Sequence, residues 1–262
     1  MKSEHASSTR SRATATEPLL LLHGGGPGVD AGSNWQTVSG PLSDRFACIA
    51  PDLLGFGARI PHGHLPRGPR AWSQARAHQL LELIDQHGLD RVHLVGNSAA
   101  GGAAALALMA LAPERIGRAV LMGGAGTGPQ PVTVPFYDDP TRASMRETLA
   151  RLVADQRDHT RLIEELTEVR WRRALVAGAE EAFRSMFGPD QDDERRTDLT
   201  EITTPVLALH GERDRVSPVE VSERLVDNLP DARLKVVTAA GHWIHVDRPL
   251  EFCTEVEEFL SS

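Results

Sequence analysis

A serine, an aspartate and a histidine each follow a short apolar run in this chain, in that order. Ser98 lies in the stretch GNSAAGG, Asp214 follows the run PVLALHG, and His242 follows RLKVVTAAG. A serine hydroxyl becomes an effective nucleophile when an imidazole takes its proton, and a buried carboxylate fixes the tautomer of that imidazole. These residue types, each placed at the end of an expected strand, predict nucleophilic catalysis by a Ser–His–Asp triad.

The glycine-rich stretch HGGGPG, residues 23 to 28, could stabilise the negative charge that forms in such a reaction. Glycines let a backbone N–H approach a reacting oxygen closely, so we expect Gly25 to supply one donor of an oxyanion hole. The second donor is expected to be the N–H of Ala99, at the start of a helix whose dipole also favours negative charge. Together with the triad, this loop predicts an acyl-transfer site.

Short apolar runs that alternate with helical patterns must position these groups. The runs predict strands at residues 18–24, 46–52, 91–96, 118–124, 205–211 and 233–242. Apolar residues at helical spacing predict helices at residues 72–88, 98–111, 219–229 and 249–260. This alternation predicts an α/β fold, with a mostly parallel sheet that helices cover on both faces.

Two regions depart from that alternation. Residues 1–17 are polar and have no apolar core, which predicts a disordered tail and argues against a secretory signal. Residues 126–204 open with the loop GTGPQPVTVPFYDDP and continue as polar helices, and we expect them to form a helical lid over the site. A purely structural extension is the other interpretation. The core then comprises residues 18–125 and 205–262.

Composition limits the classes of partner. The 262-residue chain has a formal net charge of −8, which argues against nucleic acid and anionic membranes as partners. No apolar run reaches the ~18 residues of a membrane span. Cys48 and Cys253, in apolar surroundings, predict two free buried thiols and a cytoplasmic protein. No motif predicts a cofactor or a metal, since His62 and His64 share a loop without a carboxylate cluster.

From residue 18 onward the chain resembles the α/β-hydrolase superfamily and, within it, the meta-cleavage product hydrolases. The triad order, HGGGPG, LVGNS, GHW and VRW carry the resemblance. It implies an α/β-hydrolase fold with an inserted lid and a small-molecule substrate. It also implies cleavage of a carbon–carbon bond in a 2-hydroxy-6-oxo-dienoate, a vinylogous diketone acid formed when aromatic rings are broken down.

The resemblance further implies four substrate-binding residues, namely Asn34, Asn97, Arg170 and Trp243. Arg170 would bind the carboxylate and dienolate as a bidentate fork, the two asparagines would add neutral hydrogen bonds, and Trp243 would form an apolar wall. Each residue also has a structural interpretation. Arg170 would lie on a solvated basic face, Asn34 would cap a helix, Asn97 would tolerate the strained elbow, and Trp243 would belong to the core.

Other polar residues near these motifs are expected to be structural. His23 opens the glycine loop and Asp52 follows the second expected strand, so both are expected to hold the fold together. His245, shortly after His242, is expected to be a lid or surface contact.

The same residues are compatible with functions other than carbon–carbon cleavage. One alternative is an esterase, lactonase or thioesterase that uses the same triad, and another is a non-catalytic ligand-binding protein. A cofactor-free oxygenase is a remote alternative. The substrate, rather than the triad, separates these classes.

Two departures from the family pattern bear on the sheet and the pocket. The family's sheet begins with an antiparallel hairpin, for which the polar residues 1–17 offer no candidate. We therefore expect about six strands and an edge that is either exposed or covered by an oligomer contact such as that of a homodimer. Where the family reads Gly-Asn-Ser-Met-Gly-Gly, this chain reads GNSAAGG. Ala100 is expected to crowd the packing of helix against strand, and Ala99 removes a methionine side chain from the pocket.

Overall fold

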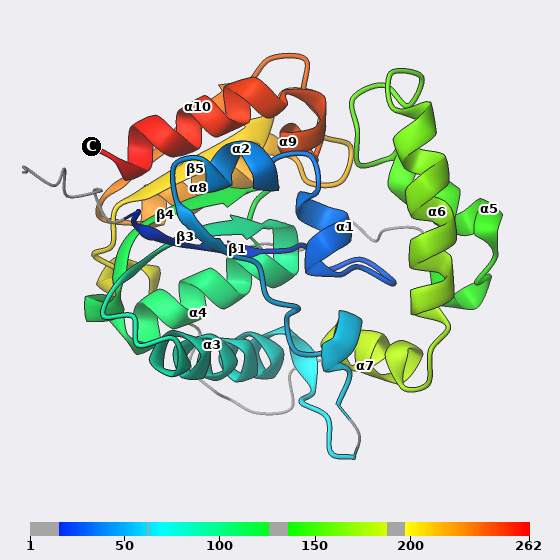
Figure 1. The fold of residues 1–262 in the computed structure, drawn as a ribbon, viewed down its shortest axis with the longest axis horizontal. Helices are drawn as coiled ribbons and strands as arrows, with labels where there is room; N and C mark the ends of the chain where they lie inside the picture. Colours follow the sequence, from blue (N-terminus) through cyan, green and yellow to red (C-terminus); the bar gives the residue numbers. More distant parts are fainter. Residues whose placement is uncertain (1–15, 62, 126–135, 188–196) are drawn as a thin grey trace, which may run out of the picture.

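The computed structural model describes residues 16–61, 63–125, 136–187 and 197–262 (Figure 1). Nearly all of the predicted tail, His62 and two stretches of the predicted lid lie outside these residues. The described part contains one sheet, helices on both of its faces, and a group of inserted helices at one side, on the right in Figure 1.

Six parallel strands form the sheet in the order β2-β1-β3-β4-β5-β6. Their bounds are Pro18–Leu22 (β1), Ala47–Ile49 (β2), Val92–Asn97 (β3), Ile116–Met122 (β4), Val206–Gly211 (β5) and Ala232–Val237 (β6). Parallel neighbours need crossover connections, which the intervening helices supply. The predicted α/β fold with a parallel sheet of about six strands is confirmed, and within the described ranges this sheet has no antiparallel hairpin.

The central strands are continuous apolar runs because both faces of the sheet are covered. On one face, Leu20 and Leu22 pack with helices α3, α4 and α8, whose bounds are Gly68–Gln86, Ala103–Leu111 and Val219–Asn228. On the other face, Leu19 and Leu21 pack with α1, α2 and α10, whose bounds are Ala31–Trp35, Ser39–Ser43 and Pro249–Leu260. Figure 1 shows α10 and α2 on one side of the sheet and α3 and α4 on the other.

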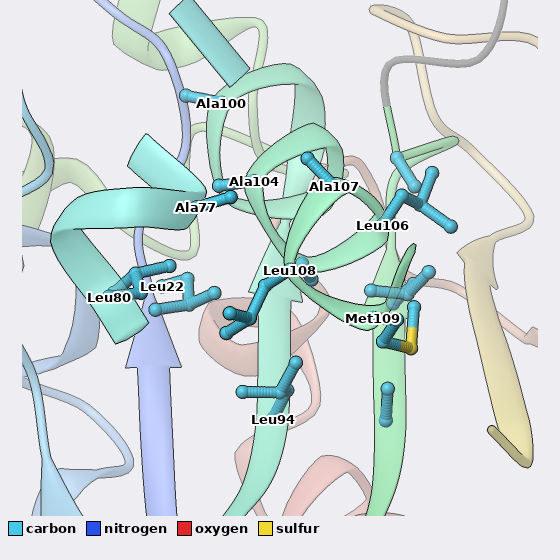
Figure 2. Packing of buried hydrophobic residues seen from close by; sticks show 14 of the residues in the cluster. Leu22, Ala77, Leu80, Leu94, Ala100, Ala104, Leu106, Ala107, Leu108 and Met109 are labelled. Carbon is cyan, nitrogen blue, oxygen red and sulfur yellow. The ribbon is translucent and has the colours of Figure 1, made fainter. Parts of the chain in front are cut away.

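Helix α4 follows the candidate nucleophile directly and is rich in alanine. Figure 2 shows Ala77 of α3 beside Ala104 of α4, with Leu80, Leu22 and Leu94 filling the space toward the sheet. Because alanine side chains end at Cβ, the two helices can approach each other closely while the leucines fill the remaining core. This packing fixes the helix that begins at Ser98.

The inserted helices are α5 (Arg142–Ala150), α6 (Thr160–Ala174) and α7 (Ala179–Met186). They come between β4 and β5 in the chain and have an apolar cluster of their own. That cluster also includes Trp243 and Val246, which lie at and within the short helix α9 (Ile244–Asp247). The insertion is therefore packed on the segment that follows His242.

Several expected elements differ in detail from those in the structure. The strand expected over 46–52 is only Ala47–Ile49. The helix expected over 98–111 begins as a five-residue π turn, Ser98–Gly102, before α4. The strand expected over 233–242 ends at Val237, because the chain then turns through Ala239, which has a φ of 59°. Cys48 and Cys253 are free thiols as predicted, but both are only half-buried. None of the helices described is both long and apolar enough to cross a bilayer.

Candidate active site

The three predicted triad residues form one hydrogen-bonded network. His242 Nε2 lies 2.8 Å from Ser98 Oγ, and His242 Nδ1 lies 2.8 Å from Asp214 Oδ2. Ser98 follows β3, Asp214 follows β5 and His242 follows β6, so the carboxyl ends of three parallel strands bring them together. An imidazole between a carboxylate and a hydroxyl can take the proton of that hydroxyl, which is the geometry that general-base catalysis requires.

Ser98 lies in the left-handed region of backbone conformation, with a φ of 54°. This conformation costs a residue other than glycine roughly 1–2 kcal/mol, so the surrounding structure must hold it. Gly96 and Gly101 make the sharp turn possible, because a Cβ on Gly96 would lie 2.9 Å from the Gly101 carbonyl oxygen. Asn97 has an ordinary φ of −97°, so the interpretation that it tolerates strain is wrong.

Asp214 is buried and ionised. Its Oδ1 accepts hydrogen bonds from the backbone N–H groups of Val216, at 2.7 Å, and Ser217, at 3.0 Å. Burial acts to raise the pKa of Asp214, but the facing His242 and these N–H donors outweigh it and hold the pKa below its ordinary value. The carboxylate therefore accepts a hydrogen bond from His242 Nδ1, which leaves Nε2 free to accept from the Ser98 hydroxyl.

A glycine after β4 leaves room for the His242 ring. Gly123 has a φ of 67°, and a Cβ there would lie 2.5 Å from Cε1 of the His242 ring. Both the backbone conformation and the contact exclude a larger residue. The sequence shows only a Gly-Gly pair after an apolar run, which does not by itself indicate that Gly123 lies at the site.

The glycine loop lies directly against the turn at Ser98. A Cβ on Gly24 would lie 3.5 Å from Ser98 Cβ, and one on Gly25 would lie 3.5 Å from the Ala100 nitrogen. The structure thus brings Gly25 beside the first turn of the helix, to which Ala99 also belongs. The closest approach to β1 is made by Gly101, where a Cβ would lie 2.2 Å from the Leu22 carbonyl oxygen, and the crowding expected at Ala100 stays a prediction.

Two buried asparagines share a hydrogen bond next to this loop. Asn34 Oδ1 accepts from Asn97 Nδ2 at 2.9 Å and from the Gly24 N–H at 3.3 Å. Because a backbone N–H can only donate, it fixes the orientation of the Asn34 amide and, in turn, that of Asn97. Asn34 Nδ2 and Asn97 Oδ1 have no partner in the described part of the chain. Asn34 lies inside α1, which Asp30 caps, so its interpretation as a cap is wrong.

Arg170 of α6 is buried, with an exposed fraction of 2%, whereas the side chain of Arg172 is 71% exposed. The interpretation of Arg170 as part of a solvated basic face is therefore wrong. Its Nε and Nη2 have no partner among the described residues, and its guanidinium lies 4.9 Å from the centroid of the Trp243 ring. Burial lowers the pKa of Arg170 to about 10, although nearby Asp30 acts to raise it. The group is still a cation at neutral pH.

Trp243 belongs to the core, and the apolar wall that the resemblance implies stays a prediction. It is buried within the apolar cluster of the insertion, and its ring also faces the guanidinium of Arg170. A cation over an aromatic face gains a modest electrostatic attraction, about 0.5–2 kcal/mol. This attraction orients Arg170 without occupying its N–H donors, which stay available for an anion.

His245 is fully buried, so its predicted role as a lid or surface contact is wrong. Its Nε2 donates to the Asn34 carbonyl oxygen at 2.8 Å, and its ring contacts those of Trp35 and Phe252. Burial lowers its pKa to about 3. A neutral His245 therefore ties the segment after His242 to Asn34, a connection that no motif in the sequence indicates.

His23 and Asp52 are structural, as predicted. Burial lowers the pKa of His23 to about 4, and its Nε2 accepts from the Leu53 N–H at 2.9 Å. Asp52 accepts from the backbone N–H groups of Ala31 and Ala58, both at 2.9 Å. Across the described residues, His64 included, no group of three or more His, Cys, Asp and Glu side chains is placed to hold a metal ion.

Comparisons with known proteins agree with this geometry. The Alpha/beta hydrolase family matches residues 19–256. The chain is 36% identical to a 2-hydroxy-6-oxo-2,4-heptadienoate hydrolase of Pseudomonas putida, over 95% of this chain and 90% of the relative. It is 34% identical to a 2-hydroxymuconate semialdehyde hydrolase of Pseudomonas putida, over 93% of this chain and 87% of the relative.

Solved structures of meta-cleavage product hydrolases also resemble this chain along most of its length. A 2-hydroxy-6-oxo-6-phenylhexa-2,4-dienoate hydrolase from a Rhodococcus strain superposes with a TM-score of 0.85 at 31% identity, over 94% of this chain and 91% of the other. A meta-cleavage product hydrolase from Pseudomonas fluorescens superposes with a TM-score of 0.78 at 28% identity, over 94% and 91% of the two chains. The chain belongs to the alpha/beta hydrolase family and is a hydrolase homologous to the meta-cleavage product carbon–carbon bond hydrolases.

Proposed function

We propose that this protein hydrolyses the carbon–carbon bond between C5 and C6 of a 2-hydroxy-6-oxo-dienoate. The observation that carries the proposal is the set of unpartnered polar atoms beside the triad. Within the described residues, Arg170 Nε and Nη2 and Asn34 Nδ2 are buried donors, and Asn97 Oδ1 is a buried acceptor. A buried polar group without a partner costs about 1–3 kcal/mol, and more when it is charged. A ligand that offers acceptors to these donors and a donor to this acceptor would remove that cost.

The pattern matches the head of such a substrate. A carboxylate accepts from the guanidinium of Arg170 and the amide of Asn34, and a neighbouring hydroxyl donates to Asn97 Oδ1. A simple ester has neither a carboxylate nor an enol hydroxyl, and it would leave these groups unsatisfied. The names of the relatives support the same substrate class, since they describe hydrolases of 2-hydroxy-6-oxo-dienoates.

The reaction begins with ketonisation of the bound dienol. The 2-hydroxyl loses its proton and C5 gains one, with no net change in protons, so the dienol becomes a diketone with carbonyls at C2 and C6. The cation at Arg170 stabilises the dienolate that forms between these two steps. This tautomerisation is needed because C5 can leave only as a carbanion whose charge spreads onto the oxygen at C2.

Ser98 then attacks C6 while His242 takes its proton, and the N–H groups of Gly25 and Ala99 stabilise the oxyanion. The C5–C6 bond breaks, its electrons pass to the C2 oxygen, and the protonated His242 returns the proton to the leaving dienolate. Water attacks the acyl group on Ser98 with His242 as base. The sum is substrate plus water giving a carboxylic acid and a 2-hydroxydienoate.

The test is the decay of the visible absorbance of 2-hydroxy-6-oxohepta-2,4-dienoate. We expect fast decay that Ser98→Ala and Arg170→Ala each reduce by at least about 100-fold, since each removes a transition-state contact. Arg172→Ala, on the same helix but exposed, is the matched control and should leave the rate unchanged. Hydrolysis of p-nitrophenyl acetate that depends on Ser98, without decay of the dienoate, would instead favour an esterase. Binding without turnover of either compound would favour a ligand-binding protein.

A further inference from the structure

The carboxylate of Asp247 connects the loop of His242 to the inserted helices through hydrogen bonds. Asp247 lies in α9, and its side chain is only 4% exposed. Its Oδ2 accepts from the Gly241 N–H at 2.7 Å and from the Ala154 N–H at 2.9 Å. Gly241 immediately precedes His242, and Ala154 lies in the connection between α5 and α6. A single oxygen atom therefore holds both segments.

The short segment of residues 150–154, which we call the anchor segment, contacts both loops that carry triad residues. The Trp243 N–H donates to the Leu152 carbonyl oxygen at 2.7 Å. Arg215, the neighbour of Asp214, donates from Nη2 to the Val153 carbonyl oxygen at 2.8 Å. Gly241 also lies close to this segment, because a Cβ on it would lie 2.7 Å from the Ala154 nitrogen. A movement of the anchor segment would therefore also displace the loops of Asp214 and His242.

The second oxygen of the carboxylate completes the arrangement. Asp247 Oδ1 lies 2.8 Å from His159 Nε2, at the start of α6. A buried carboxylate is tolerated only where donors surround it, and here two backbone N–H groups and one imidazole do so. Of these three contacts, only the two at Oδ2 involve the residue next to His242 and the anchor segment.

We propose that Asp247 is a positioning residue, which fixes His242 against Ser98 by holding the Gly241 N–H and the anchor segment. This inference rests on the proposed function, because it presumes proton transfer between Ser98 and His242. Proton transfer depends steeply on geometry, and a displacement of about 1 Å can cost about 100-fold in rate. Arg170 and Asn34 lie on α6 and α1, and neither is a direct partner of the Asp247 carboxylate, so we expect its loss to act on proton transfer more than on binding of the substrate head.

The test compares Asp247→Ala with Asp247→Asn on 2-hydroxy-6-oxohepta-2,4-dienoate. Alanine removes the acceptor, and we expect kcat to fall about 10- to 100-fold with KM changed less than about twofold. One amide oxygen can accept from both N–H groups, while the amide NH₂ faces His159 in its other tautomer. Asp247→Asn should therefore restore kcat to within about threefold of the wild type. The matched control is His159→Gln, which keeps a donor toward Oδ1 and should leave kcat unchanged.

A second measurement is the rate at which a fluorophosphonate labels Ser98, which reports the activation of the hydroxyl without the substrate head. We expect slow labelling in Asp247→Ala and near-normal labelling in Asp247→Asn. If Asp247→Ala does not unfold cooperatively, Asp247→Ser replaces it, because a hydroxyl is too short to hold both N–H groups. The inference would be overturned if Asp247→Ala, or the serine variant in its place, labelled at the same rate as the wild type. It would also be overturned if Asp247→Asn lost as much labelling rate as the alanine variant. Failure of the wild type itself to react at Ser98 would instead overturn the proposed function, and this inference with it.

Discussion

Asn34 orients Asn97 through a hydrogen bond of 2.9 Å between Asn34 Oδ1 and Asn97 Nδ2. The donor left on Asn34 and the acceptor left on Asn97 are both buried and unpartnered within the described residues. One contact therefore gives the site a donor and an acceptor at fixed places. It also makes Asn97 dependent on Asn34, because the amide of Asn97 is oriented through that of Asn34, which the Gly24 N–H orients in turn.

Replacing Asn34 by aspartate should weaken binding of an anionic head. Asn34→Asp keeps an acceptor for Asn97 Nδ2 and Gly24, but it replaces the free donor with a negative charge that faces the substrate carboxylate. Loss of a hydrogen bond to a charged group costs about 1.5–3 kcal/mol, so KM for the dienoate should rise at least about 10-fold. KM for the neutral ester p-nitrophenyl acetate should stay the same. An equal rise for both compounds would contradict this role.

The left-handed backbone at Ser98 makes an unusual prediction about stability. Glycine normally destabilises a helix relative to alanine, but at a φ of 54° the order should reverse. Ser98→Gly should exceed Ser98→Ala in free energy of unfolding by about 1 kcal/mol, measured by urea denaturation. Both variants lose the hydroxyl and the bond to His242, so their difference reports the strain alone. Alanine at least as stable as glycine would show that the turn is not strained.

Gly28 should control the distance between the glycine loop and α6. Its φ is 63°, and a Cβ there would lie 1.9 Å from the carbonyl oxygen of Arg170. Gly28→Ala should lower the free energy of unfolding by more than about 1 kcal/mol and raise KM for the dienoate, because α6 must move away. Gly88→Ala is the matched control, with a φ of 62° and nothing within 4 Å of the added Cβ. Gly88→Ala should lower the free energy of unfolding through backbone strain but leave KM for the dienoate unchanged.

Two buried histidines should make the protein sensitive to mild acid. Burial lowers the pKa of His23 to about 4 and that of His245 to about 3, while both take up protons near pH 6.5 in the unfolded chain. Between these values the unfolded state binds more protons, so the free energy of unfolding falls as the pH falls from about 6.5 to 4. Each histidine contributes a slope of up to about 1.4 kcal/mol per pH unit.

Urea denaturation at several pH values measures this slope, and a His23→Gln variant should show a shallower one. The amide oxygen of glutamine can still accept from the Leu53 N–H, so the variant keeps an acceptor at this position. The same slope in both proteins would mean that His23 titrates normally when folded.

The alternation of apolar runs and helical patterns is sufficient to predict the strands, most helices and the order of the triad. Each strand is short, continuous and bounded by glycine or polar residues, so few other arrangements bury it. The strand expected to reach His242 ends early at Val237, because the turn through Ala239 depends on a left-handed residue that is not glycine. Local propensity does not reveal such a residue.

The residues proposed to bind substrate show the limit of prediction from the sequence. Arg170 stands among arginines in RWRR, and nothing in the letters distinguishes the buried one from its exposed neighbours. Which arginine is buried depends on the packing of α6 against Trp243 and against the backbone of Gly28. His245 resembles a surface residue in the sequence for the same reason, since its partner is a backbone carbonyl far away in the chain. Such contacts leave no local pattern.

The π turn from Ser98 to Gly102 has a consequence for how this segment can vary in length. A π turn holds one residue more than the α-helical turn it replaces, and such bulges are frequent at functional sites. The extra residue stays within the turn, because Gly101 contacts β1 and α4 continues from Ala103 with regular geometry. Deleting one alanine would reduce the π turn to an α-helical one, but it would also move the Ala99 N–H, the proposed oxyanion donor, or remove the buried Ala100. The length of this turn is thus tied to the placement of the oxyanion donor.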